Sequence, residues 1–144
     1  DPRTLLASGN LVVDSHADPA DLEARLEAGI AARFGRPIEV MVRTPDQWAA
    51  LIAANPFSRQ AADNGSRLLV MVMKAGLAAG AIETLQGLAV GDEQAAAVDG
   101  SLYLWCADGI GRSRMAEKAV PRLTGVGTGR NWNTVLRLAA LVDV

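Results

Sequence analysis

The chain has 144 residues, which is enough for one domain with a sizeable core and too few for two ordinary domains. Half of the residues are hydrophobic, 21% are charged and the formal net charge is −2, which excludes a disordered chain and argues against a general nucleic-acid binder. One Cys and one His exclude an internal disulfide and argue against a histidine-based metal site, and the apolar stretches are shorter than a membrane span. We expect a cytoplasmic domain without a metal or cofactor.

The first part of the chain predicts strands on either side of one helix. Apolar residues around Ser8-Gly9-Asn10 favour a strand pair or one bulged strand over 3–14. A helix is expected to begin at Asp18-Pro19 and to end at Gly35. Alternating apolar and polar residues then predict a half-buried strand over 38–43. The stripe that we expect this helix to bury consists of Leu22, Leu26, Ile30 and Phe34.

The middle of the chain predicts a helix, a loop, a central strand and a second helix. Thr44-Pro45-Asp46-Gln47 is a capping-box pattern for a helix that ends at Asn55-Pro56, and residues 57–66 are polar enough for a surface loop. The unbroken apolar run from 68 to 73 is typical of a strand buried on both faces. An alanine-rich helix over 77–88 is expected next.

The last third predicts a hairpin followed by helices. The expected segments are strands 95–98 and 101–106 around Asp99-Gly100, a loop over 107–111, a helix over 112–121 and a last helix over 131–142. This order favours an α+β fold, in which helices cover a mixed β-sheet that is partly ferredoxin-like, with a late hairpin and two C-terminal helices.

Four segments of the chain resemble the domain-of-unknown-function 1697 family of uncharacterised bacterial proteins. They are Ser8–Val13, Asn55–Phe57, Asp108–Ser113 and Arg130–Val135. The likeness covers essentially the whole chain, and it implies a cytoplasmic bacterial protein whose family has no agreed activity. Members of the family usually begin with a further strand and helix, so the resemblance implies that residues 1–144 form a single domain that lacks those two elements.

A second, local likeness suggests a chemistry. Residues 106–113 match the Cys-x5-Arg-Ser/Thr phosphate loop of the protein tyrosine and dual-specificity phosphatases. Its glycines would turn backbone N–H groups into one concavity, and Arg112 would hold two phosphate oxygens. Those groups would lower the pKa of Cys106 and favour the thiolate that attacks phosphorus. This predicts Cys106 and Arg112 as catalytic residues. Against it, Trp105 stands where those enzymes usually have His, and no Asp has a motif that marks it as the general acid.

A milder hypothesis keeps the loop and drops the covalent step. Residues 101–144 carry six basic and three acidic side chains, whereas residues 1–100 carry 8 basic and 13 acidic ones. A reversible anion site in the last third is therefore our first expectation, with a phosphate-bearing or carboxylate small molecule as its partner. Its expected ligands are Gly109, Gly111, Arg112 and Ser113 of the 107–113 loop, with Arg130 and Asn131 from the start of the last helix.

A structural or protein-interaction module, including a homodimer, is the remaining alternative. The glycines then form only a tight turn, Arg112 pairs with an acid such as Asp108, and Cys106 is a small buried hydrophobe. Asn131 is then an N-cap, and Trp132 anchors the core.

Overall fold

The computed structural model describes residues 3–5 and 9–144. Its centre is a four-stranded sheet in the order β4-β5-β3-β6. The strands are β3 (Leu68–Met73), β4 (Gln94–Val98), β5 (Ser101–Trp105) and β6 (Gly127–Asn131). The predicted strand over 68–73 and the predicted hairpin are confirmed, and Asp99 and Gly100 both take the positive φ that such a tight turn requires.

The connections around this sheet confirm the α+β class and its ferredoxin-like part. From β3 onward the chain runs strand, helix, strand, strand, helices, strand, which is the split βαβ pattern. The helices are α4 (Ala81–Gln86), α5 (Arg114–Lys118) and α6 (Pro121–Thr124). We expected a mixed sheet, but each pairing between the described strands is antiparallel.

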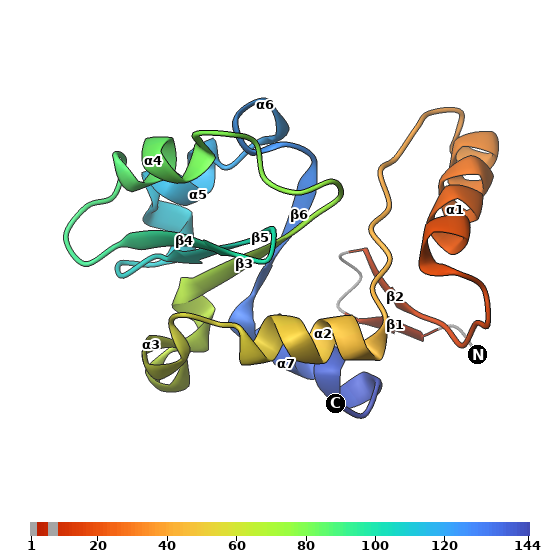
Figure 1. Ribbon diagram of the computed structural model, residues 1–144, viewed down its shortest axis with the longest axis horizontal. Helices are drawn as coiled ribbons and strands as arrows, with labels where there is room; N and C mark the ends of the chain where they lie inside the picture. Colours follow the sequence, from red (N-terminus) through yellow and green to blue (C-terminus); the bar gives the residue numbers. More distant parts are fainter. Residues whose placement is uncertain (1–2, 6–8) are drawn as a thin grey trace.

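Helices cover both faces of the sheet (Figure 1). One face carries α4, α5 and α6, and the other carries α2 (Pro45–Ala53), α3 (Ser58–Asp63) and α7 (Trp132–Leu141). The alternation along β3 explains the two cores, because successive side chains of a strand point to opposite faces. Val70 and Val72 pack with Trp132 on the α7 side, whereas Met71 and Met73 pack with Leu85, Leu102 and Met115 on the α4 side.

The N-terminal part lies beside this sandwich (Figure 1). β1 (Arg3–Leu5) and β2 (Asn10–Val12) form an antiparallel pair, which is one of the two arrangements that we predicted for residues 3–14. Residues 6–8 of that prediction lie outside the described residues. α1 (Pro19–Phe34) begins at the Asp18 cap and ends at Gly35 with φ 73°, as predicted. We expected its apolar stripe to be buried, and that expectation is wrong. No residue of α1 is buried, and Phe34 is 65% exposed.

The predicted strand over 38–43 is wrong. The segment is extended but pairs with no strand among the described residues. The reason is that carboxylates take the place of a neighbouring strand: the backbone N–H of Val40 donates to Glu27 Oε2 at 3.1 Å, and that of Val42 donates to Glu23 Oε2 at 2.8 Å.

Three further boundaries differ from the predictions. The expected loop over 57–66 contains α3 and a 3₁₀ turn, Gly65–Arg67. The helix expected over 77–88 is limited to α4, because Gly80 at φ 77° precedes it and Gly87 caps its end. The helix expected over 112–121 is divided into a 3₁₀ turn, Ile110–Arg112, and α5, and Pro121 begins α6 instead of ending a longer helix.

β6 is the strand that the sequence did not predict. It reads Gly-Thr-Gly-Arg-Asn and has no apolar alternation, so its assignment comes from its pairing with β3. The predicted last helix follows it as α7, and the Asn131 side chain caps that helix by accepting the backbone N–H of Thr134 at 3.0 Å.

Candidate functional site

Cys106 directly follows β5 and lies inside the core on the α4 side of the sheet. Its side chain is 0% exposed and packs in the same cluster as Leu85 and Met115. The thiol lies 3.7 Å from the carbonyl oxygen of Leu104. Burial raises the pKa of Cys106, with a smaller opposing effect from Ser113. The environment therefore favours the neutral thiol, which is the opposite of what a nucleophilic cysteine requires.

Three backbone amides of the 107–113 loop donate to carbonyl groups of the chain itself. Gly109 N–H bonds to the Cys106 carbonyl at 2.8 Å, Arg112 N–H to the Gly109 carbonyl at 3.2 Å, and Ser113 N–H to the Ile110 carbonyl at 3.2 Å. The Ser113 hydroxyl accepts from the backbone N–H of Ala116 and caps α5. These donors form a tight turn, and they would be available to a ligand only if the turn gave up those bonds.

Arg112 is exposed at the end of this turn. Within the part of the chain that the structure describes, no ion pair joins it to Asp108. Arg67 binds the start of the loop through two hydrogen bonds. Its Nη1 donates to the Ala107 carbonyl at 2.5 Å, and its own carbonyl accepts the Cys106 N–H at 2.8 Å.

Arg130 is directed toward β2. Its Nε donates to Asn10 Oδ1 at 2.6 Å, and its Nη1 donates to Thr128 Oγ1 at 2.6 Å and to the Gly129 carbonyl at 2.8 Å. Burial lowers the pKa of Arg130. Two of the segments that carry the family likeness therefore meet at Asn10 and Arg130, but these contacts direct the guanidinium to β2 and β6 and not to the 107–113 loop.

Two surface cavities lie elsewhere on the sandwich. The first, which we call the α4–α6 cavity, measures about 260 Å³ and is lined by Thr84, Leu88, Lys118, Val120, Arg122 and Leu123. The second, which we call the α2 cavity, measures about 380 Å³ and lies between α2, the end of β3 and the β4–β5 turn. Arg43, Gln47, Lys74, Asp99 and Tyr103 are among the residues that line it.

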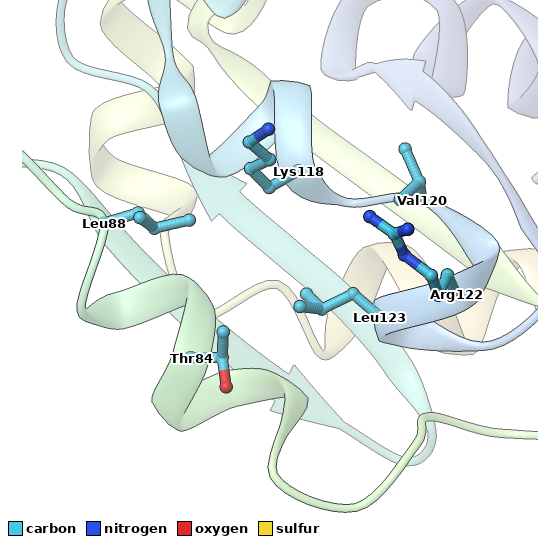
Figure 2. Close-up of a pocket in the computed structure, with 6 residues that line it drawn as sticks. All are labelled: Thr84, Leu88, Lys118, Val120, Arg122 and Leu123. Atoms are coloured by element: carbon cyan, nitrogen blue, oxygen red, sulfur yellow. The ribbon is translucent and has the colours of Figure 1, made fainter.

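The α4–α6 cavity combines an apolar interior with two cations (Figure 2). Figure 2 shows Leu88 on the α4 side and Leu123 on the α6 side projecting toward the space between them. Lys118 and Arg122 stand on the α5–α6 wall, at the end of α5 and within α6. Among the described residues Arg122 has no ion-pair partner, and Lys118 has only a 3.9 Å contact with its exposed neighbour Glu117.

Our prediction from the sequence included neither Lys118 nor Arg122 among the site residues. The excess of basic residues after position 100 was the only signal that pointed to them. That signal gives a region and not a site, because it does not show which cations share a wall with apolar side chains.

No cluster of three or more His, Cys, Asp or Glu side chains that could hold a metal ion occurs in residues 3–5 and 9–144. Over the same residues, no helix has the length and apolar character that crossing a bilayer requires.

Comparison with known proteins gives one match. The family model described as "Protein of unknown function (DUF1697)" matches residues 1–103, from the N-terminus into β5. No curated protein and no protein of known structure matches the chain. The matched region covers more than half of the 144 residues, so the chain belongs to the DUF1697 family of proteins of unknown function.

Proposed function

We propose that this chain is a binding domain for a small organic anion that carries an apolar portion, and that the α4–α6 cavity holds it. The observation that supports this proposal is the placement of two weakly paired cations, Lys118 and Arg122, beside the apolar side chains of Leu88, Val120 and Leu123. Val120 is 39% exposed, so its side chain is available to a ligand.

The apolar portion and the anionic group of such a ligand contribute differently to the free energy of binding. Each buried CH₂ group contributes about 0.8 kcal/mol, so the apolar portion supplies most of the affinity. An exposed ion pair contributes only about 0.2–1 kcal/mol, so the cations select for charge more than they add binding energy. Ligand cavities usually measure about 300–1,000 Å³, and the α4–α6 cavity, at about 260 Å³, lies just below that range and suits only a small molecule.

The 107–113 loop supports a site less well. An anion there would have to displace the hydrogen bonds that Gly109, Arg112 and Ser113 make to the chain's own carbonyls. α5 has five residues, so it adds little helix-dipole charge at that place. For phosphatase chemistry, the buried Cys106 thiol would also need to ionise against its raised pKa. Our proposal therefore keeps an anion-binding function and assigns the anion to Lys118 and Arg122.

Calorimetric titration with three probes tests this assignment. Octanoate carries a carboxylate and an apolar chain, octanol has the chain without the charge, and inorganic phosphate has charge without the chain. We expect octanoate to bind more tightly than octanol and phosphate to bind least. Arg122→Ala and Lys118→Ala should each weaken octanoate binding by about fivefold and leave octanol binding unchanged.

Arg112→Ala is the matched control, because Arg112 is also exposed, carries the same guanidinium as Arg122 and lies outside the cavity. It should bind octanoate as the unmodified chain does. Loss of binding in Arg112→Ala with full binding in Arg122→Ala would return the site to the 107–113 loop. Absence of octanoate binding in the unmodified chain would reject the proposal.

A further inference from the structure

Lys74 joins two parts of the molecule that share little apolar contact. It follows β3 in the sandwich, and its ammonium contacts groups of α1 and of the extended segment 38–43. Its Nζ lies 2.7 Å from Glu27 Oε2, 3.2 Å from Glu23 Oε1, 3.2 Å from Glu39 Oε2 and 3.0 Å from the Val40 carbonyl oxygen. One cation on the sheet therefore holds three carboxylates and a backbone carbonyl of the N-terminal part.

The same carboxylates hold α1 and the extended segment together. Glu27 and Glu23 accept the backbone N–H groups of Val40 and Val42 while they contact Lys74. The hydrogen bond to Lys74 lowers the pKa of Glu27, and those to the glutamates raise the pKa of Lys74. Residues 19–42 thus form one unit, which we call the α1 unit, and Lys74 is the point where it is fastened to the sheet.

The α1 unit lacks the apolar anchoring that holds the other elements. No residue of α1 is buried, and Phe34 and Ile38 are 65% and 42% exposed. Met41, in the extended segment, packs partly buried against the core cluster beneath α2. A helix that has no buried residue and is fastened by partly exposed charges has a low free energy of local opening compared with the buried strands.

The fastening point is also part of a cavity wall. Lys74 lines the α2 cavity together with Arg43, which follows the α1 unit directly and donates to the Met73 carbonyl. Asp99 lines the same cavity from the β4–β5 turn. A displacement of the α1 unit would free the Lys74 ammonium and change the entrance to this cavity.

We propose that the α1 unit is a movable flap over the end of β3, and that Lys74 is the latch that keeps it closed. The latch contains three carboxylates for one ammonium, and the four side chains keep 21–54% of their surface exposed. Dissolved salt therefore reaches the charges and weakens the latch, since at about 1 M salt the screening length falls to about 3 Å.

Hydrogen–deuterium exchange of the full chain, followed by mass spectrometry of its peptides, tests the latch. We expect Lys74→Met to accelerate exchange in residues 19–42 about tenfold and to leave peptides of β3 and β5 unchanged. Lys74→Arg keeps the charge and should keep the protection. Arg25→Met removes an exposed cation of α1 that takes no part in the ion pairs of Lys74 with Glu23, Glu27 and Glu39, and it should exchange like the unmodified chain.

Salt provides the second comparison. About 1 M NaCl should accelerate exchange of residues 19–42 in the unmodified chain but have little further effect in Lys74→Met. The proposal is overturned if Lys74→Met leaves residues 19–42 as protected as before. It is also overturned if β3 and β5 accelerate to the same extent, because Lys74 would then support the whole fold and not a flap.

Discussion

At the scale of single residues, surroundings decide what a side chain can do. Cys106 has the sequence spacing of a phosphatase nucleophile, yet its thiol is fully buried between the sheet and α5. Burial favours the neutral form, so its folded-state pKa lies above the ordinary value for a thiol. The spacing of residues along the chain shows which reactive side chains are present, and only the fold shows which of them are exposed to solvent.

This burial predicts slow chemistry at Cys106, the single cysteine of the chain. At about pH 8 a disulfide reagent such as dithiobis(nitrobenzoate) should label the folded protein at least a hundredfold more slowly than the chain unfolded in guanidinium, because both access and the thiolate fraction are reduced. Release of the coloured thiolate at 412 nm measures the rate. Labelling of the folded protein at the unfolded rate would show a reactive thiolate and revive the nucleophile hypothesis.

The arginines show the same limit for the candidate site. Arg112, Arg122 and Arg130 carry the same side chain and lie in the same basic third of the chain. From the sequence we expected Arg112 and Arg130 to hold the anion. In the structure Arg130 is bonded to Asn10 and Arg112 points from a closed turn, whereas Arg122 lines a cavity. The sequence predicted the basic third of the chain, and the choice among its cations depends on α4, which lies far away in sequence.

At the scale of elements, local signals were reliable where the chain itself determines the structure. The caps of α1, α2 and α7, the Asp99-Gly100 turn and the apolar run of β3 were all predicted. Two failures share one cause. Segment 38–43 has the alternation of a strand without a strand partner, and β6 has a partner without the alternation. Pairing is a long-range event that a local pattern does not contain.

The two N-caps provide a prediction at this scale. Thr44 caps α2 through the Gln47 N–H at 3.2 Å, and Asp18 caps α1 through the Ala20 N–H at 3.1 Å. We expect Thr44→Ala to lower the free energy of global unfolding by about 1 kcal/mol, because Leu51 of α2 belongs to the core. Asp18→Ala should leave that free energy nearly unchanged, because α1 has no buried residue.

Urea unfolding followed by the fluorescence of the tryptophans, Trp48, Trp105 and Trp132, measures both variants. These residues lie in or against the core cluster beneath α2 and α7, so they report on the sandwich. Equal losses for Thr44→Ala and Asp18→Ala would contradict this prediction, because α1 would then unfold together with the sandwich.

At the scale of the whole molecule, the family match covers only one wall of the candidate site. The match to DUF1697 ends at residue 103, so it includes Thr84 and Leu88 of the cavity, whereas Lys118 and Arg122 lie beyond it. The matched part contains the α1 unit, α2 and most of the sheet, which together form the frame. The anion-binding proposal therefore rests on the cavity itself and does not derive from the family.

The frame also brings distant segments of the sequence together. The Asn55-Pro56-Phe57 segment places Phe57 in the core cluster that contains Trp132, and Asn10 meets Arg130. These contacts give a structural role to three of the four segments in which we saw the family likeness, and the fourth, Asp108–Ser113, forms the turn before α5. The family model matches residues 1–103, so it covers the first two of these segments and not Asp108–Ser113 or Arg130–Val135.

Octanoate binding in the α4–α6 cavity is tested most directly by titrating the ¹⁵N-labelled protein with octanoate and recording its amide NMR spectrum. We expect the largest shift changes at Thr84, Leu88, Lys118 and Leu123, which line the cavity, and little movement of amides 109–113. Largest changes at Gly109, Gly111 and Arg112, with the cavity residues unmoved, would contradict it.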